Sequence, residues 1–148
     1  EYVEARLVDE LTVAAPDRPA AFALVRLLTL AEIVASVGNE GGDYVARELV
    51  RRGRDLLPGD AALGFTRTDE LAVLLPGLTA EEAAKVLTFA IDSLDEVRLP
   101  GGAEVPLRYA VGLAAYPEHA SDADGLYMAA DAALADAVDR NETLAVAI

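Results

Sequence analysis

The pattern of apolar and polar positions along the first part of the chain predicts helices on either side of one buried strand. Val3, Leu7 and Leu11 recur at helical spacing, so a helix is predicted over 2–14. The apolar run over 21–30 is short enough for a buried strand, and a helix follows it. The glycines of 35–43 favour a turn before another helix over 44–57.

The second part of the chain predicts a hairpin followed by alternating helices and strands. Strands over 61–65 and 71–75 are joined by a tight connection. Thr79, with Glu82 three residues later, has the pattern of a capping box and begins a helix that reaches 94. A strand over 107–115, an alanine-rich helix over 125–138 and a strand over 143–148 complete the chain. This order predicts an α+β fold with a ferredoxin-like βαββαβ core, in which helices pack around a mainly antiparallel sheet.

Composition narrows the classes of function. Twelve basic and 26 acidic residues give a net charge of −14, which opposes contact with nucleic acid or an anionic membrane. The arginine-rich stretch over 47–54 is predicted to be a solvated helix face. Cysteine is absent, which excludes disulfides and thiolate chemistry, and the one histidine, His119, is expected to be solvated in a loop. No apolar run approaches the ~20 residues of a membrane span. We therefore expect one cytoplasmic domain over 1–148, cut from a longer multidomain protein because the chain begins at Glu1.

Several segments, in order, resemble one family. The stretch RTDELAVLLPGLTAEEA resembles the signature hairpin of the GGDEF domains and the strand and helix that follow it. GNEGGD resembles the family's GH-x-x-GD, and YAVGLAAYPEHASDADGLYMAADAAL resembles its later strand, loop and helix. The five signature positions are held by Arg67, Thr68, Asp69, Glu70 and Leu71. Active GGDEF domains are diguanylate cyclases, so the resemblance implies a nucleotide-cyclase-like fold and a site where two metal ions help to join two GTP molecules at a dimer interface.

At several of these positions the chain departs from the family pattern. In an ungapped count the metal-binding aspartate corresponds to Arg26, and arginine cannot ligate a cation. Val34 stands where an asparagine reads guanine, and Arg67 and Thr68 replace the two signature glycines. We expect Arg26 to pair with a carboxylate, with Asp69 as the hypothetical partner. Asp69 and Glu70 are expected in a solvated bend, and Asp69 alone is a weak metal candidate.

Other positions keep the residues of the family pattern. Gly38, Gly42 and Asp43 match the GH-x-x-GD segment, although Asp43 is equally explained as a charge near a helix N-terminus. A shift of two residues brings Arg140 and Asn141 onto the family's RN. The weak nucleotide-binding candidates are therefore Asp43, Gly38, Gly42 and Arg140.

Two further positions of the family lack their expected residues. Without the shift, Val138 falls at the phosphate-contacting lysine. The product-inhibition motif would begin near Pro58 and is absent. A receptor for cyclic di-GMP at that surface would lack its main anchor.

The sequence thus predicts a catalytically inactive GGDEF domain that acts as a regulatory or dimerisation module in bacterial cyclic di-GMP signalling. No catalytic residue and no cofactor is assigned, with Mg²⁺ expected only alongside residual nucleotide binding. The expected partners are other domains of the same protein, a signalling partner or a second copy. An alternative is a sensor that binds GTP or cyclic di-GMP and controls a neighbouring domain. A third is a weak residual cyclase, although Asp69 and Glu70 alone cannot supply the two-metal geometry.

Overall fold

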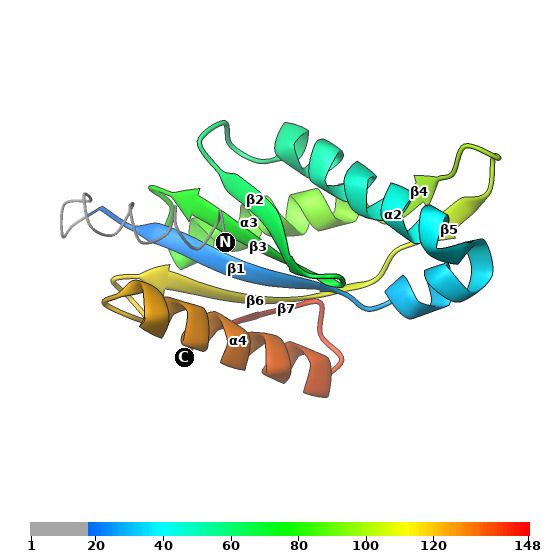
Figure 1. Ribbon diagram of the computed structural model, residues 1–148. Helices are drawn as coiled ribbons and strands as arrows, with labels where there is room; N and C mark the ends of the chain where they lie inside the picture. Colours follow the sequence, from blue (N-terminus) through cyan, green and yellow to red (C-terminus); the bar gives the residue numbers. More distant parts are fainter. Residues whose placement is uncertain (1–17) are drawn as a thin grey trace.

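A five-stranded sheet forms the centre of the molecule, for which a computed structural model describes residues 18–148 (Figure 1). Its order is β2-β3-β1-β6-β7. The β6–β7 pair is parallel, and the other neighbouring pairs are antiparallel. The strands are β1 (Ala20–Leu27), β2 (Ala62–Arg67), β3 (Glu70–Pro76), β6 (Tyr109–Tyr116) and β7 (Leu144–Val146). The helix predicted over 2–14 lies outside the described residues.

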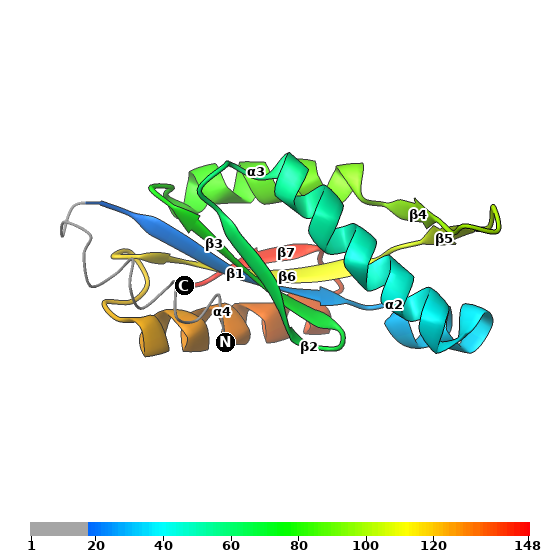
Figure 2. The same ribbon diagram turned by 45° about the horizontal axis from the view of Figure 1, so that its top comes forward.

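Helices cover both faces of this sheet. α2 (Leu30–Leu56) and α3 (Ala80–Ser93) lie on one face, and α4 (Ala123–Asp139) lies on the other (Figures 1 and 2). Alternate residues of β1 enter two separate cores: Ala23 and Val25 belong to the α2 and α3 side, and Phe22 and Leu24 to the α4 side. Burial on both faces explains why β1 is apolar at every position except Arg26. The predicted α+β architecture with a mainly antiparallel sheet is confirmed.

The predicted break between two helices lies at Gly38, within 35–43. α2 (Leu30–Leu56) consists of two helical stretches that meet at a kink at this residue, although the second stretch begins before residue 44, where it was predicted to begin. Gly38 has φ 80° and ψ 176°, a conformation that glycine adopts without steric cost. A second short hairpin, β4 (Glu96–Arg98) with β5 (Glu104–Pro106), forms where only a turn was predicted.

α4 lies unusually close to the sheet because small residues face each other. A Cβ atom placed on Gly112 of β6 would lie 2.1 Å from the carbonyl oxygen of Ala130 and 2.3 Å from the amide nitrogen of Leu134. Ala130 and Ala137 are fully buried on the facing side of the helix. The alanine-rich composition of α4 therefore sets the separation between this helix and the sheet.

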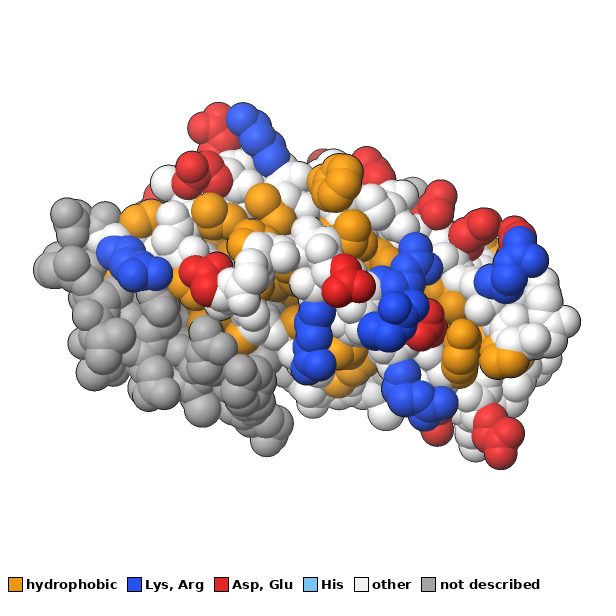
Figure 3. Space-filling view, turned by 90° about the horizontal axis from the view of Figure 1, so that it is seen from above, with side chains coloured by type: hydrophobic (Ala, Val, Ile, Leu, Met, Phe, Trp, Pro, Cys, Tyr) orange, Lys and Arg blue, Asp and Glu red, His pale blue; other side chains and the backbone are white. Residues whose placement is uncertain are grey.

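The arginine-rich stretch of α2 is only partly a solvated face. Figure 3 looks onto the side that carries α2 and α3, where basic and acidic side chains are interspersed. Arg51 is exposed, as predicted, and pairs with Glu48 at 2.8 Å. Arg52 instead donates hydrogen bonds to the carbonyl oxygens of Ser93 (3.0 Å) and Glu96 (3.2 Å). Arg52 thereby ties α2 to the end of α3, and the prediction was wrong for this residue.

The prediction for His119 was also wrong. Its side chain is only 7% exposed, and its Nδ1 accepts a 2.9 Å hydrogen bond from the amide of Ala115. The His119 amide donates in return to the Ala115 carbonyl at 2.8 Å. The loop after β6 therefore folds back on the strand end, and an accepting Nδ1 places the proton of the neutral ring on Nε2.

Within residues 18–148, no helix is both long and apolar enough to cross a membrane.

Candidate functional site

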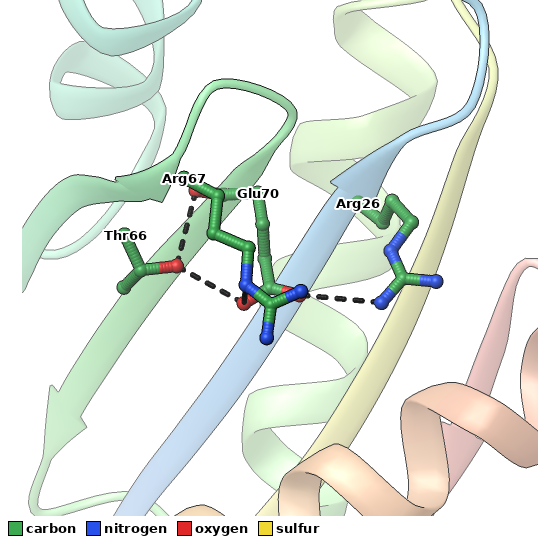
Figure 4. A network of polar contacts seen from close by, with 4 residues as sticks. All are labelled: Arg26, Thr66, Arg67 and Glu70. Carbon is green, nitrogen blue, oxygen red and sulfur yellow. Dashed lines mark hydrogen bonds and ion pairs between the residues drawn. The ribbon is translucent and has the colours of Figure 1, made fainter.

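The tip of the β2–β3 hairpin carries a buried carboxylate. Glu70 begins β3 and is 0% exposed, although it is next to the turn. Arg26, near the end of the central strand β1, is its direct cross-strand partner. The register of β2 shifts between Phe65 and Arg67, and Thr66 lies in this irregular segment. Strand pairing therefore brings Arg26, Thr66 and Arg67 around Glu70, as Figure 4 shows.

The two carboxylate oxygens of Glu70 have different partners. Arg26 Nη2 donates to Oε1 at 3.4 Å, and Thr66 Oγ1 lies 3.0 Å from Oε2 and 3.3 Å from the Glu70 carbonyl oxygen. Arg67 Nε lies 4.0 Å from Oε2. The Arg26 side chain is 32% exposed and that of Arg67 is 65% exposed. A buried carboxylate is costly unless it is paired and hydrogen-bonded, and these contacts satisfy that requirement.

This geometry corrects two expectations from the sequence. Arg26 pairs with Glu70 rather than with Asp69, because Glu70 holds the matching position on the neighbouring strand. The bend is exposed at Arg67 and Thr68, and Asp69 is half-buried. Glu70 is buried, so a solvated bend was the wrong description for this residue. The carbonyl oxygen of Asp69 accepts a 2.7 Å hydrogen bond from the amide of Leu27, which fixes the turn against β1.

The residues at this point do not fit a divalent metal ion. A cation would need oxygen ligands, but Oε1 of Glu70 already faces the guanidinium of Arg26, and Oε2 faces Thr66 and Arg67. Arginine offers only donors. In the part of the chain that the structure describes, no group of three or more His, Cys, Asp or Glu side chains is arranged to hold a metal.

A cleft of about 640 Å³ lies between α2 and the hairpin. Half-buried apolar residues and polar groups share its wall. Its lining residues are Leu30, Val34, Asn39, Gly42, Asp43, Ala46, Phe65, Thr66, Arg67 and Thr68.

The cleft brings together only part of the predicted nucleotide-binding set. Gly42 and Asp43 line it, whereas Gly38 lies at the break in α2 and Arg140 caps the far end of α4. Val34 fills the space beside Gly42, because a Cβ on Gly42 would lie 2.8 Å from Val34 Cγ2. Val34 and Asp43 therefore line the same cleft, and Val34 offers no hydrogen-bonding group to it.

A second hollow has a volume of about 700 Å³. It and the cleft lie on opposite sides of the segment that follows β1. The amide of Leu27 bonds to the hairpin at Asp69, and the amide of Leu28 bonds to the carbonyl oxygen of Arg108 at 2.8 Å, on the opposite side. The hollow is lined by Leu28, Ile91, Asp92, Asp95, Leu107, Arg108, Tyr109, Ala137, Val138, Asn141, Glu142 and Thr143. Val138 and Asn141, which the resemblance singled out near the C-terminus, line it, but its other residues come from segments far apart along the chain that carry no motif.

Comparison with known proteins places this fold and hairpin in one family. Residues 1–143 match the family described as diguanylate cyclase, GGDEF domain. The chain belongs to the GGDEF family. This agrees with the resemblance carried by the hairpin and by the segments on either side of it.

Solved structures share the fold over nearly the whole chain. The GGDEF domain of YfiN (TpbB) from Pseudomonas aeruginosa is 28% identical with a TM-score of 0.92, and the match covers 99% of this chain and 94% of that one. The GGDEF domain of DgcB from Caulobacter crescentus, solved with cyclic di-GMP, has a TM-score of 0.85 at 14% identity over 97% of this chain and 86% of that one, a likeness in fold alone.

One curated relative matches over a shorter stretch. The probable diguanylate cyclase DgcC of Escherichia coli K12 is 34% identical over 77 residues. That stretch is 52% of this chain and 21% of the relative. The chain thus spans a small part of DgcC.

Proposed function

We propose that this chain is a catalytically inactive GGDEF domain that serves as a regulatory or dimerisation module in bacterial cyclic di-GMP signalling. The observation that carries the proposal is the ion pair between the half-buried Arg26 and the buried Glu70. In active relatives, as the family resemblance implies, an aspartate at the position of Arg26 binds metal. Here a guanidinium lies against Glu70 and repels a cation.

The neighbouring cleft supports the same conclusion. Val34 cannot hydrogen-bond a base edge, and it packs where a polar reader of guanine would be needed. Arg67 and Thr68 bring side chains to a turn where glycines would leave room for phosphate. Since each lost interaction lowers transition-state stabilisation by a few kcal/mol, their joint loss reduces a rate by many orders of magnitude.

A cyclase assay tests this function. Purified protein at high concentration is incubated with GTP and Mg²⁺ or Mn²⁺, and the products are separated by chromatography. We expect no cyclic di-GMP, and clear turnover would refute the proposal. A variant that combines Arg26→Asp, Val34→Asn, Arg67→Gly and Thr68→Gly serves as the comparison, because it returns the family's residues to the site.

A second function is supported by the retained cleft. Asp43 and Gly42 still line a space of about 640 Å³, a size in the range of small-molecule sites. A sensor that binds GTP or cyclic di-GMP there would control a neighbouring domain without turnover. Titration calorimetry with each nucleotide separates the two functions. Heat that disappears in an Asp43→Ala variant would favour the sensor, and no heat at millimolar ligand would favour the scaffold.

A further inference from the structure

The second hollow combines an apolar floor with exposed apolar side chains. Leu107, Tyr109 and Ala137 are buried at its base. Leu28 and Val138 are more than a third exposed, at 37% and 39%. An apolar centre inside a polar rim is the arrangement found in protein interfaces.

The rim of this hollow is electrically negative. Three exposed carboxylates line it, those of Asp92, Asp95 and Glu142, against the single guanidinium of Arg108. Within residues 18–148, none of these four side chains takes part in an ion pair. The rim therefore has carboxylates that a partner can neutralise.

The residues around the hollow also disfavour the phosphate groups of a nucleotide, which the family resemblance would place near this position. By the ungapped count, Val138 stands at the phosphate-contacting lysine that the family resemblance implies. The hollow begins at Leu28, two residues after Arg26. A phosphate entering here would meet the carboxylates of Asp92, Asp95 and Glu142, so the hollow is unsuited to a nucleotide's phosphates.

We propose that this hollow docks a basic segment of a partner protein, with apolar side chains on Leu28 and Val138 and Lys or Arg side chains beside Asp92, Asp95 and Glu142. The apolar floor selects a polypeptide over a simple cation, and the negative rim selects a basic one. This inference rests on the proposed function, because a regulatory module needs a surface that binds a partner protein. The hollow's volume of about 700 Å³ is sufficient for a few side chains.

The test uses the full chain and three defined probes, followed by backbone amide NMR shifts. The first is a peptide of alternating Lys and Leu, the second replaces each Lys with Glu, and the third is spermine. We expect saturable shifts around the hollow with the Lys-Leu peptide only, weakening as salt is raised. The double variant Asp92→Lys/Asp95→Lys should weaken binding about tenfold.

A matched control separates this site from general attraction to an acidic protein. Asp131 is exposed on α4 and does not line the hollow, so Asp131→Lys should leave binding unchanged. Equal losses in both variants, shifts spread over the surface, or equal binding of spermine would overturn the proposal. The cyclase assay is independent of these shifts. Absent peptide binding with absent turnover would refute the docking surface alone, and turnover would refute the proposed function alone.

Discussion

The hydroxyl of Tyr109 on β6 donates a 2.7 Å hydrogen bond to the carbonyl oxygen of Leu94, the C-cap residue of α3. Both residues are buried, so removing the donor leaves the carbonyl without a partner in an apolar place. We predict that Tyr109→Phe lowers the free energy of unfolding by about 1–2 kcal/mol. Urea denaturation followed by circular dichroism measures this, and an unchanged midpoint would contradict it.

The same tyrosine gives stability an alkaline dependence. Burial raises the pKa of the Tyr109 hydroxyl above its ordinary value of 10.0, so the folded protein keeps a proton that the unfolded chain loses. The stabilisation is fully present below pH 10 and is lost as pH rises above it. A Tyr109→Phe variant should show a smaller decline between pH 9.5 and 11 in chemical denaturation, roughly the range set by the unfolded pKa.

Gly112 lets α4 approach the sheet. Gly112→Ala places a methyl group against the backbone of Ala130 and Leu134, which cannot rotate away. We predict a loss of about 2–3 kcal/mol in unfolding free energy. Gly59→Ala is the matched control, since nothing lies within 4 Å of its added Cβ and its stability should change by about 0.5 kcal/mol at most. Similar losses in both variants would show that helix separation is not the cause.

The capping box of α3 gives a third prediction. Glu82 N–H donates to Thr79 Oγ1 at 3.2 Å, and Thr79 N–H donates to Glu82 Oε1 at 2.9 Å. Thr79→Ala removes the side-chain acceptor at the N-cap and should cost about 1 kcal/mol. Thr79→Ser keeps the hydroxyl and should restore most of the loss in thermal unfolding. If serine and alanine behave alike, the hydroxyl is not the stabilising group.

The pair of Arg26 and Glu70 is best tested by a double-mutant cycle. Arg26→Leu leaves a buried carboxylate with weaker partners, and we predict a loss of about 1–3 kcal/mol. Arg67→Leu should cost less than about 1 kcal/mol, because that side chain is mostly exposed and its Nε is 4.0 Å away.

The single variant Glu70→Leu and the double variant Arg26→Leu/Glu70→Leu complete this cycle. The double variant should recover much of the loss, since replacing both charges with apolar groups removes the desolvation penalty. Additive losses in urea denaturation would show that the two side chains do not interact.

Local features of the fold were predictable from the sequence, and long-range pairings were not. The capping box depends on residues three apart, and the β2–β3 hairpin on residues around one turn, so both follow from neighbouring positions. The partner of Arg26 depends on the register between β1 and β3, which pairs it with Glu70 rather than Asp69. A shift of one residue would turn the other side chain toward it.

Arg52, His119 and the second hollow share this difficulty. Arg52 bonds to carbonyl groups more than forty residues away, and such acceptors carry no side-chain signal. His119 is buried because its loop turns back on Ala115, which composition alone cannot show. The hollow around Leu28 and Val138 forms only when separate helix ends meet.

The burial of Glu70 also limits how this lineage can change. Replacing Arg26 with aspartate would set two carboxylates on adjacent strands and leave Glu70 without its nearest cation. Such a chain would be unstable unless a metal ion arrived at the same time. A single substitution of Arg26 by a metal-binding residue would therefore produce a poorly folded protein, so Arg26 and Glu70 can be replaced only together.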